Sequence, residues 1–240
     1  MKRILLSASF CVCAAALPAF GQTDEPDSAT YEAVLTALPE PTPLFNPSCL
    51  AEPAEVQAEA ALIRDFVFGP ATAPPYHAAF DAETGKVILA LIDGGVAAAP
   101  DPARFRAGLP LGNFHVEMAK AFTALGLDPA SVIDVSAVYL NALWAVREGD
   151  FSALEPNQPR LRALRDQLAL AELRCFHLGA TGPALSEHRN QLLARIGILI
   201  DGLRSASRNG ELESYQAFVR DRFGQDIEGR ALTDKGFVSE

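Results

Sequence analysis

The chain has 240 residues and a formal charge of −10, with 30 acidic side chains against 20 lysines and arginines. An excess of negative charge repels phosphate backbones and anionic bilayers, so the composition argues against nucleic acid and membrane surfaces as partners. Hydrophobic residues make up 49% of the chain, which at this length is enough for the core of one large domain.

The first 21 residues have the pattern of an export signal. Lys2 and Arg3 precede a long apolar run, and the small residues Ala19 and Gly21 have the spacing of a cleavage site. We therefore expect cleavage after Gly21 and a mature chain that starts at Gln22 in the periplasm or outside the cell. The alternative is a segment that stays uncleaved as an N-terminal anchor.

Export makes the cysteines informative. Cleavage would remove two of the four and leave Cys49 and Cys175. An even pair in an oxidising compartment predicts one disulfide, which would tie the proline-rich N-terminal segment to a C-terminal helix. The alternative is two buried free thiols. The apolar spacing around Cys175 places this residue on the buried face of its helix.

The N-terminal part reads as an extension in front of a helical domain. Asp27 can cap a short helix, 28–38. The four prolines between 39 and 47 then exclude a helix and predict an extended strap. A second helix is expected over 53–68. The predicted organisation is a signal peptide at 1–21, the extension at 22–52 and a helical domain at 53–240.

The region after residue 70 has the weakest pattern. Segments 76–81 and 86–92 flank a turn-like Ala82-Glu83-Thr84-Gly85 and can be read as a small hairpin. Residues 86–94 can equally form a short helix, which we favour because no further strands are predicted to complete a sheet. A short turn around 102–107 follows.

The stretch 128–149 is the strongest element of the sequence. Asp128 and Pro129 are typical of the first positions of a helix, and Gly149 is typical of the position after its end. The residues between are apolar almost all round, so we expect neighbouring helices to bury this one. Its apolar run is too short and too interrupted by polar residues for a membrane span, and none is expected in the mature chain.

Four more helices are predicted from apolar faces at helical spacing. They cover 114–125 (capped by Asn113), 159–178, 183–207 and 212–223. Gly197 and Gly202 lie inside one of them and permit close approach by a neighbour. The predicted fold is therefore all-α. It is a single globular bundle of six to eight helices, with the proline-rich extension and, in the alternative reading of 76–92, one small hairpin.

Charge is unevenly distributed along the chain. Positions 22–150 hold 18 acids against 6 bases, whereas positions 151–240 hold 12 of each. Two readings are open for the arginines that follow the central helix: they face the acidic half, or they form a solvated helix face. They are Arg160, Arg162, Arg165 and Arg174. His188 and Arg189 are read as part of another exposed face.

The sequence contains no complete motif for catalysis, metal binding or nucleotide binding. His115 and Glu117 have the H-x-E spacing of zinc deaminases, but the required P-C-x-x-C partner is missing. Cys175 and His177 diverge on a helix and cannot readily share a metal. The fragment that starts at Asp81 alternates carboxylates like a calcium loop but lacks the remaining ligands. We expect no cofactor.

Asp134, Asn141 and Glu148 are spaced by sevens and so form one polar stripe on the central helix. Polar groups on a buried helix need partners. One possibility is hydrogen bonding to a neighbouring helix, with arginines of the C-terminal half as partners. The other is a polar-lined ligand groove beside Tyr139 and Trp144.

Three features of the C-terminal half occur together. They are the stretch GLDPASVIDVSAVYLNALWAVREG (126–149), the arginine-rich helix after it and the ending Leu232-Thr233-x-x-Gly236-Phe237. Together they resemble a family of exported bacterial helical domains of unknown function, over about 114–238. The resemblance implies a helical fold and a cell-envelope location. It implies no activity and assigns no catalytic residue.

The sequence favours an exported helical protein that binds a protein or a small ligand in the cell envelope without catalysis. One alternative is an envelope hydrolase whose acid and base groups come from His115, Glu117, Asp134 and Glu148. Another is a structural envelope component that forms oligomers through the proline-rich strap.

Overall fold

A computed structural model of the chain describes residues 26–40, 49–68, 76–108, 114–150, 154, 159–175 and 182–239. The predicted export signal, most of the proline-rich strap and the predicted cap Asn113 lie outside these residues. Apart from one two-stranded hairpin, the regular structure is helical, so the all-α prediction is confirmed.

The described residues form ten α-helices, more than the six to eight predicted. In chain order they are α1 (Ser28–Ala37), α2 (Pro53–Ala58), α3 (Ala60–Phe68), α4 (Ala82–Val96), α5 (Pro102–Gly108), α6 (Phe114–Leu125), α7 (Val132–Glu148), α8 (Pro159–Cys175), α9 (Pro183–Asn209) and α10 (Leu212–Phe223). A 3-10 turn, η4 (Gly224–Ile227), leads to β1 (Arg230–Thr233) and β2 (Gly236–Ser239). The count rises because the expected helix 53–68 breaks at Glu59 and the uncertain region forms α4 and α5.

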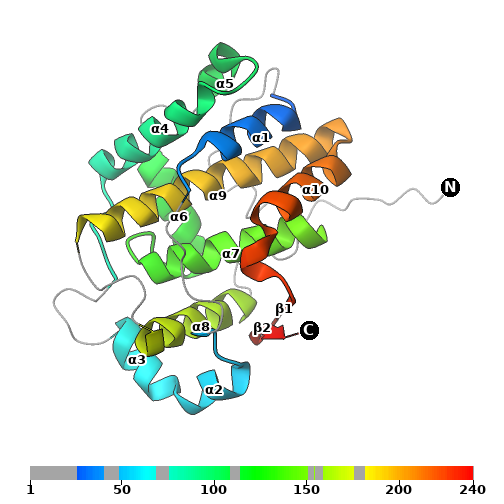
Figure 1. Ribbon diagram of the computed structural model, residues 1–240. Coiled ribbons are helices and arrows are strands. Elements are labelled where there is room, and N and C mark those ends of the chain that lie inside the picture. Colours follow the sequence, from blue (N-terminus) through cyan, green and yellow to red (C-terminus); the bar gives the residue numbers. More distant parts are fainter. Residues whose placement is uncertain are drawn as a thin grey trace.

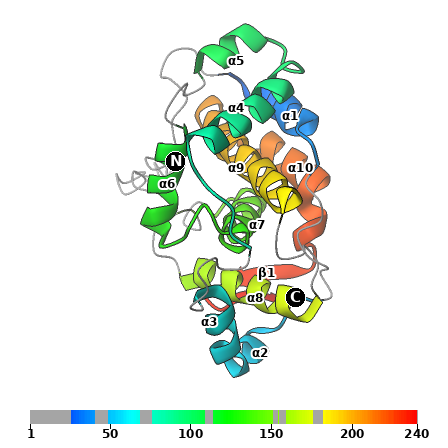
Figure 2. The ribbon, with the colours of Figure 1, turned by 90° about the vertical axis from the view of Figure 1, so that its left-hand side faces the viewer.

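The helices stack in successive layers, with α9 and α7 across the middle (Figures 1 and 2). Helices α4 and α5 lie at one end and α2 and α3 at the other. Helix α7 packs against α8, α9, α10 and η4. Fourteen of its 17 residues are buried, which confirms that neighbouring helices enclose it. No helix of the described ranges combines the length and apolar character of a bilayer span.

Helix α7 begins at Val132, three residues after Pro129, the predicted first helical position. Its cap is Ser131, whose hydroxyl accepts a hydrogen bond from the backbone N–H of Asp134 at 3.2 Å. Asp128 instead closes the preceding turn, where its carboxylate accepts from Ala130 N–H at 2.8 Å. The cause is not local: the carbonyl of Ala130 and the N–H of Val132 are bonded to the distant segment that starts at residue 76. The predicted end of the helix is correct, because Gly149 is left-handed with φ 68°.

The possible hairpin at 76–92 is wrong. Asp81 caps α4 by accepting from Thr84 N–H at 2.9 Å, so the fragment that resembled a calcium loop is a helix start. The hairpin of this protein lies at the C-terminus, where β1 and β2 pair in antiparallel register with Arg230 opposite Ser239.

The C-terminal hairpin is fixed by a side chain of α8. The fully buried amide of Gln167 accepts from Phe237 N–H at 2.7 Å and donates to the Phe237 carbonyl at 2.7 Å. It also donates to the carbonyl of Ala51 at 2.8 Å. The side-chain amide of Gln167 therefore makes the two hydrogen bonds to Phe237 that a neighbouring strand would make. It also joins the tail to the segment before α2.

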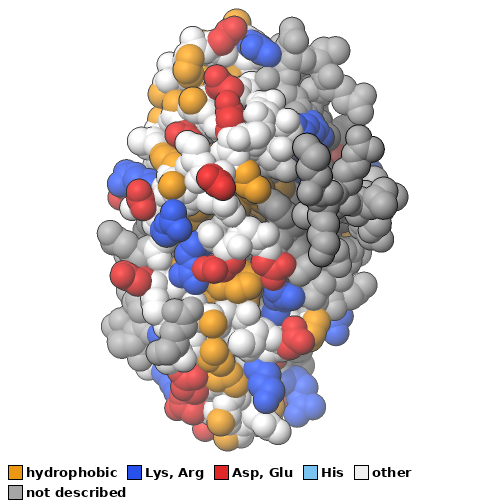
Figure 3. Space-filling view, turned by 90° about the vertical axis from the view of Figure 1, so that its right-hand side faces the viewer, with side chains coloured by type: hydrophobic (Ala, Val, Ile, Leu, Met, Phe, Trp, Pro, Cys, Tyr) orange, Lys and Arg blue, Asp and Glu red, His pale blue; other side chains and the backbone are white. Residues whose placement is uncertain are grey.

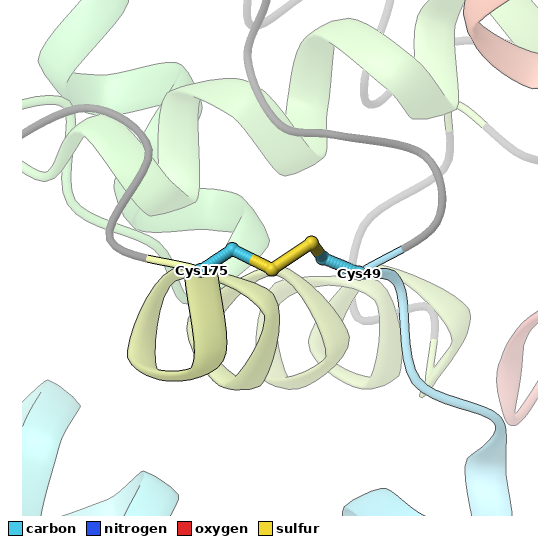
Figure 4. Close-up of a disulfide and its surroundings, with 2 residues drawn as sticks. All are labelled: Cys49 and Cys175. Carbon is cyan, nitrogen blue, oxygen red and sulfur yellow. A yellow bond between two sulfur atoms is a disulfide. The ribbon is translucent and has the colours of Figure 1, made fainter.

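Cys49 and Cys175 form a disulfide, as predicted, across a sequence separation of 126 (Figure 4). The bond fastens the segment before α2 to the end of α8. The predicted burial of Cys175 is wrong, because this residue is exposed. It is the last described residue of α8, and the predicted positions 176–178 lie outside the described residues.

The arginines that follow the central helix divide between the two readings. Arg160 pairs with Asp150 at 3.0 Å and Arg174 with Glu55 at 3.0 Å, so these two reach the acidic half. Arg165 contacts its own neighbour Asp166 at 2.8 Å. Acidic and basic side chains lie next to one another over the face shown in Figure 3, and exposed pairs of this kind contribute little stability.

Helix α1 packs into the same hydrophobic core as the later helices. Its side chains Tyr31, Val34 and Leu35 are almost completely buried, and the helix contacts α9 and α4. Helices α1 and α10 approach α9 at Gly202, where an added Cβ would overlap the hydroxyl of Tyr215 and lie 2.9 Å from Cβ of Tyr31. The predicted close approach is thus present at Gly202.

The second glycine of α9 behaves differently. A Cβ added at Gly197 would meet no atom of a neighbouring element within 4 Å in the described part of the chain. The prediction that a neighbour approaches closely at Gly197 is therefore wrong, and this position has room for a methyl group.

The two glycines form a matched pair for mutation. Gly202→Ala is expected to lower the free energy of unfolding by about 2 kcal/mol, because the methyl group overpacks the junction of α1, α9 and α10. Gly197→Ala is expected to raise it by about 0.5–1 kcal/mol, because alanine favours helix over glycine. Urea denaturation of both variants measures this, and a shift of the same sign in both would contradict the described packing.

Candidate functional site

The five residues of the predicted groove do not share one open surface. Asp134, Tyr139 and Asn141 are buried, Trp144 is partly buried and Glu148 is exposed. Asp134 and Glu148 lie at opposite ends of α7, about 21 Å apart at the rise of an α-helix.

Three of the five residues face arginines of the C-terminal half. One of them, Asp134, belongs to the polar stripe for which such partners were one of the two predictions. Arg165 of α8 places its positive charge near Asp134, and Arg195 of α9 is hydrogen-bonded to the side chain of Tyr139. Trp144 has the guanidinium of Arg160 5.9 Å from its ring centre. Arginines thus contact α7 at several points along its length.

The four residues of the hydrolase alternative are also separated. His115 packs against α4, where its Cβ would lie 3.1 Å from a Cβ added at Gly85. Glu117 pairs with Lys120 at 2.7 Å on the exposed side of α6. Because Asp134 and Glu148 occupy opposite ends of α7, the four side chains cannot converge on one substrate.

The structure instead gathers titratable groups around residues 76–80, a non-helical stretch called here the 76–80 segment. Its backbone pairs with the residues before α7: Ala78 N–H donates to Ala130 O at 3.0 Å, and Val132 N–H donates to Tyr76 O at 2.9 Å. Tyr76 adopts the left-handed conformation with φ 63°. Such a conformation is unfavourable for a bulky residue and is found where surrounding contacts impose it, often at functional sites.

A histidine and two aspartates lie where the 76–80 segment meets α7. Nε2 of His77 is 3.5 Å from Oδ2 of Asp128, and the N–H of Asp128 donates to Oδ2 of Asp134 at 2.8 Å. The hydrogen bond from His77 holds the pKa of Asp128 below its ordinary value. A chain of contacts thus runs from the partly exposed His77 through the carboxylate and the backbone N–H of Asp128 to the buried carboxylate of Asp134.

Asp134 is the inner member of this group. Only 6% of the residue is exposed, and its Oδ1 has no hydrogen-bond partner among the described residues. Burial raises the pKa of Asp134 to about 6, against the opposing effects of the Asp128 N–H and the positive charge of Arg165. Asp134 therefore changes its charge close to neutral pH.

Helix α8 contributes a second buried acid. Tyr76 is 3% exposed and its hydroxyl is hydrogen-bonded to Glu172, which is 2% exposed. Burial, and then the negative charge of Glu172, raise the pKa of Tyr76 to about 12. The ring of Tyr76 packs against Phe66 of α3 with 5.2 Å between ring centres.

Helix α9 holds the 76–80 segment from another side. Arg189 donates from its two terminal nitrogens to the carbonyls of Ala78 and Ala79, and its guanidinium lies 5.6 Å from the centre of the Phe80 ring. Burial lowers the pKa of Arg189, and the charges of Asp81 and Asp128 oppose that effect. The prediction that His188 and Arg189 lie on an exposed face is wrong, because both are buried.

Perturbed titratable groups that gather at one place are a feature of functional sites, although structural networks share it. Of the residues predicted from sequence, only Asp134 belongs to this group. Tyr76, His77 and Arg189 were missed because they come from segments that are neighbours only in the fold. No three His, Cys, Asp or Glu side chains of the described ranges are placed to hold a metal ion.

Replacing Asp134 by asparagine is expected to stabilise the protein at pH 7.5. The pKa of Asp134 in the folded state is about 6, above its ordinary value of 3.8. The protonated carboxyl is therefore the form that favours folding, and its contribution to stability is lost as the pH rises through 6. Asp134→Asn should raise the free energy of unfolding by about 1–2 kcal/mol at pH 7.5, with no gain at about pH 2.5, where the carboxyl is protonated in both states.

Urea denaturation at the two pH values measures this effect. The matched control is Asp201→Asn, because Asp201 is also 6% exposed but pairs with Arg204 at 2.8 Å. The control should lose stability at pH 7.5 instead of gaining it. A loss of stability in Asp134→Asn at pH 7.5 would show that the buried carboxylate is favourable.

Comparison with protein-family models, with curated proteins and with solved structures finds no match for this chain. The resemblance to exported bacterial helical domains therefore stays a prediction from the pattern of residues 114–238.

Proposed function

We propose that this chain is an exported helical protein that binds a partner in the cell envelope and does not act as an enzyme. Export is supported by the leader pattern of residues 1–21 and by the disulfide of Cys49 and Cys175, because disulfides persist in oxidising compartments. The acidic composition directs the proposal towards a protein or a small molecule and away from nucleic acid.

The binding role is supported by the hydrogen bonds that buried polar side chains make to distant parts of the main chain. Gln167, Arg189 and Arg195 each donate to main-chain carbonyls at least 70 positions away. They hold surface segments in place and are not directed at one reacting group. A surface fixed in this way loses little conformational entropy on binding, which favours affinity.

The ends of the proline-rich strap illustrate this fixation. Arg195 donates to the carbonyls of Leu38 and Pro39 at 3.0 Å each, and Cys49 is held by the disulfide to α8. Both ends of the strap are therefore attached to buried helices, although residues 41–48 lie outside the described part.

Export and the disulfide are tested by intact-mass analysis of the full chain expressed in a bacterial host. We expect a mature mass that begins at Gln22 and no alkylation of Cys49 or Cys175 in denaturant until reductant is added. Loss of the bond should lower the free energy of unfolding by about 2–4 kcal/mol. The control Cys175→Ser should leave one cysteine that alkylates without reductant. An uncleaved mass, or two alkylated cysteines in the wild type, would contradict the proposal.

The binding role is tested with the mature chain immobilised in its native form and in a reduced, alkylated form. A partner from envelope extract should be retained by the native form, displaced by excess soluble native chain and absent from the unfolded control. Release of soluble fragments from purified cell-wall polymer by the native chain would instead favour the hydrolase alternative. Oligomers in light scattering that disappear when residues 41–47 are deleted would favour the structural alternative.

A further inference from the structure

The 76–80 segment is held by three helices that follow much later in the chain. Its backbone is bonded to the residues that lead into α7, Arg189 of α9 binds two of its carbonyls, and Glu172 of α8 binds the hydroxyl of Tyr76. It is not part of a helix or a multi-stranded sheet, so its position depends on these few contacts. Segments with few contacts are those that open at the lowest free energy.

The contact with α7 is the one that carries titratable charge. Asp134 is faced by Asp128 from the turn before α7, by His77 from the 76–80 segment and by Arg165 from α8. Asp128 is faced in turn by His77 and by Arg189 of α9. When ionised, Asp134 has a like charge beside it in Asp128 and no donor for Oδ1 among the described residues.

We propose that the attachment of the 76–80 segment to the start of α7 is controlled by pH and is tightest in mildly acidic solution. A proton on Asp134 removes its repulsion with Asp128 and ends the burial of an incompletely bonded charge. Both aspartates belong to the stretch whose backbone binds the segment, through Ala130 O and Val132 N–H. The buried charge of Asp134 therefore lies two residues from Val132, whose N–H makes that attachment.

The two acids set opposite limits to the pH range. The pKa of Asp134 is raised to about 6, so its contribution to stability is complete below its ordinary value and is lost as the pH rises through 6. The pKa of Asp128 is lowered by His77, so its contribution is lost only when the pH falls below the ordinary value of 3.8. The attachment is therefore strongest near about pH 4 and weakens as the pH rises through 6.

Opening of the segment would uncover the buried ring of Tyr76 and the partly buried ring of Phe66, which pack against each other. The protein would thus present an apolar surface at neutral pH that it covers in acid. This inference does not depend on the proposed partner or on export, because it concerns an equilibrium within the chain. Its failure would leave the binding proposal untouched.

Hydrogen exchange of the mature chain at pH 5 and pH 8 tests the inference. The reporters are the amides of Ala78 and Val132, which donate across the contact, with rates divided by their intrinsic values at each pH. We expect protection about tenfold higher at pH 5, as follows from a group that titrates near pH 6. The amide of Phe237, bonded to Gln167 at the far hairpin, serves as an internal control whose protection should change less than twofold.

Variants assign the effect to its source. Asp134→Asn should abolish the tenfold change and give at pH 8 the protection that the wild type shows at pH 5, whereas Asp201→Asn should keep the change. Equal protection in the wild type at both pH values, or a pH response that persists in Asp134→Asn, would overturn the inference.

A measurement on the wild type keeps the test decisive if Asp134→Asn does not fold. The carboxyl carbon of Asp134 is followed by NMR from pH 3 to pH 8. A midpoint near 6 that coincides with the change in protection supports the inference, and a midpoint near 4 overturns it.

Discussion

The enclosure of α7 is the constraint on which the other features of the structure depend. Fourteen of its 17 residues are buried, and α8, α9, α10 and η4 all contact it. A helix enclosed in this way gives its polar side chains no access to bulk water, so they must find partners inside the protein. Tyr139 is hydrogen-bonded to Arg195 of α9. Asp134 accepts from the N–H of Asp128 and lies near the positive charge of Arg165.

Two arginines and a glutamine of the C-terminal half provide hydrogen-bond partners for polar groups of the main chain in the same way. The 76–80 segment, the start of the strap and the tail contain carbonyls that no helix or sheet ladder satisfies. Arg189, Arg195 and Gln167 donate to these carbonyls from α9 and α8. Long polar side chains on buried helices thus hold non-helical segments in place, which supports a binding role.

The candidate site illustrates how far sequence reasoning reaches into such a fold. Asp134 could be singled out because it is a carboxylate on a helix that is otherwise apolar. His77 and Arg189 carry no such mark, since neither stands out in its local sequence and both approach Asp128 only in the fold. The predicted groove extended along α7 because spacing on one helix was the only geometry available, whereas the actual group is centred on one end of that helix.

The sequence by itself determined the elements whose signals are local. Apolar periodicity and capping residues placed α6 and α10 at their observed bounds and ended α7 at Gly149, because a helix is set by contacts within a few residues. Tertiary structure alone decided where α7 begins, where the hairpin forms and which arginines are buried. Each of these depends on a partner from a distant segment: the 76–80 segment for α7, Gln167 for the hairpin, and main-chain carbonyls of Ala79 and Leu38 for Arg189 and Arg195. Such long-range pairs leave no periodic trace in the chain, since their energy appears only when the segments have been brought together.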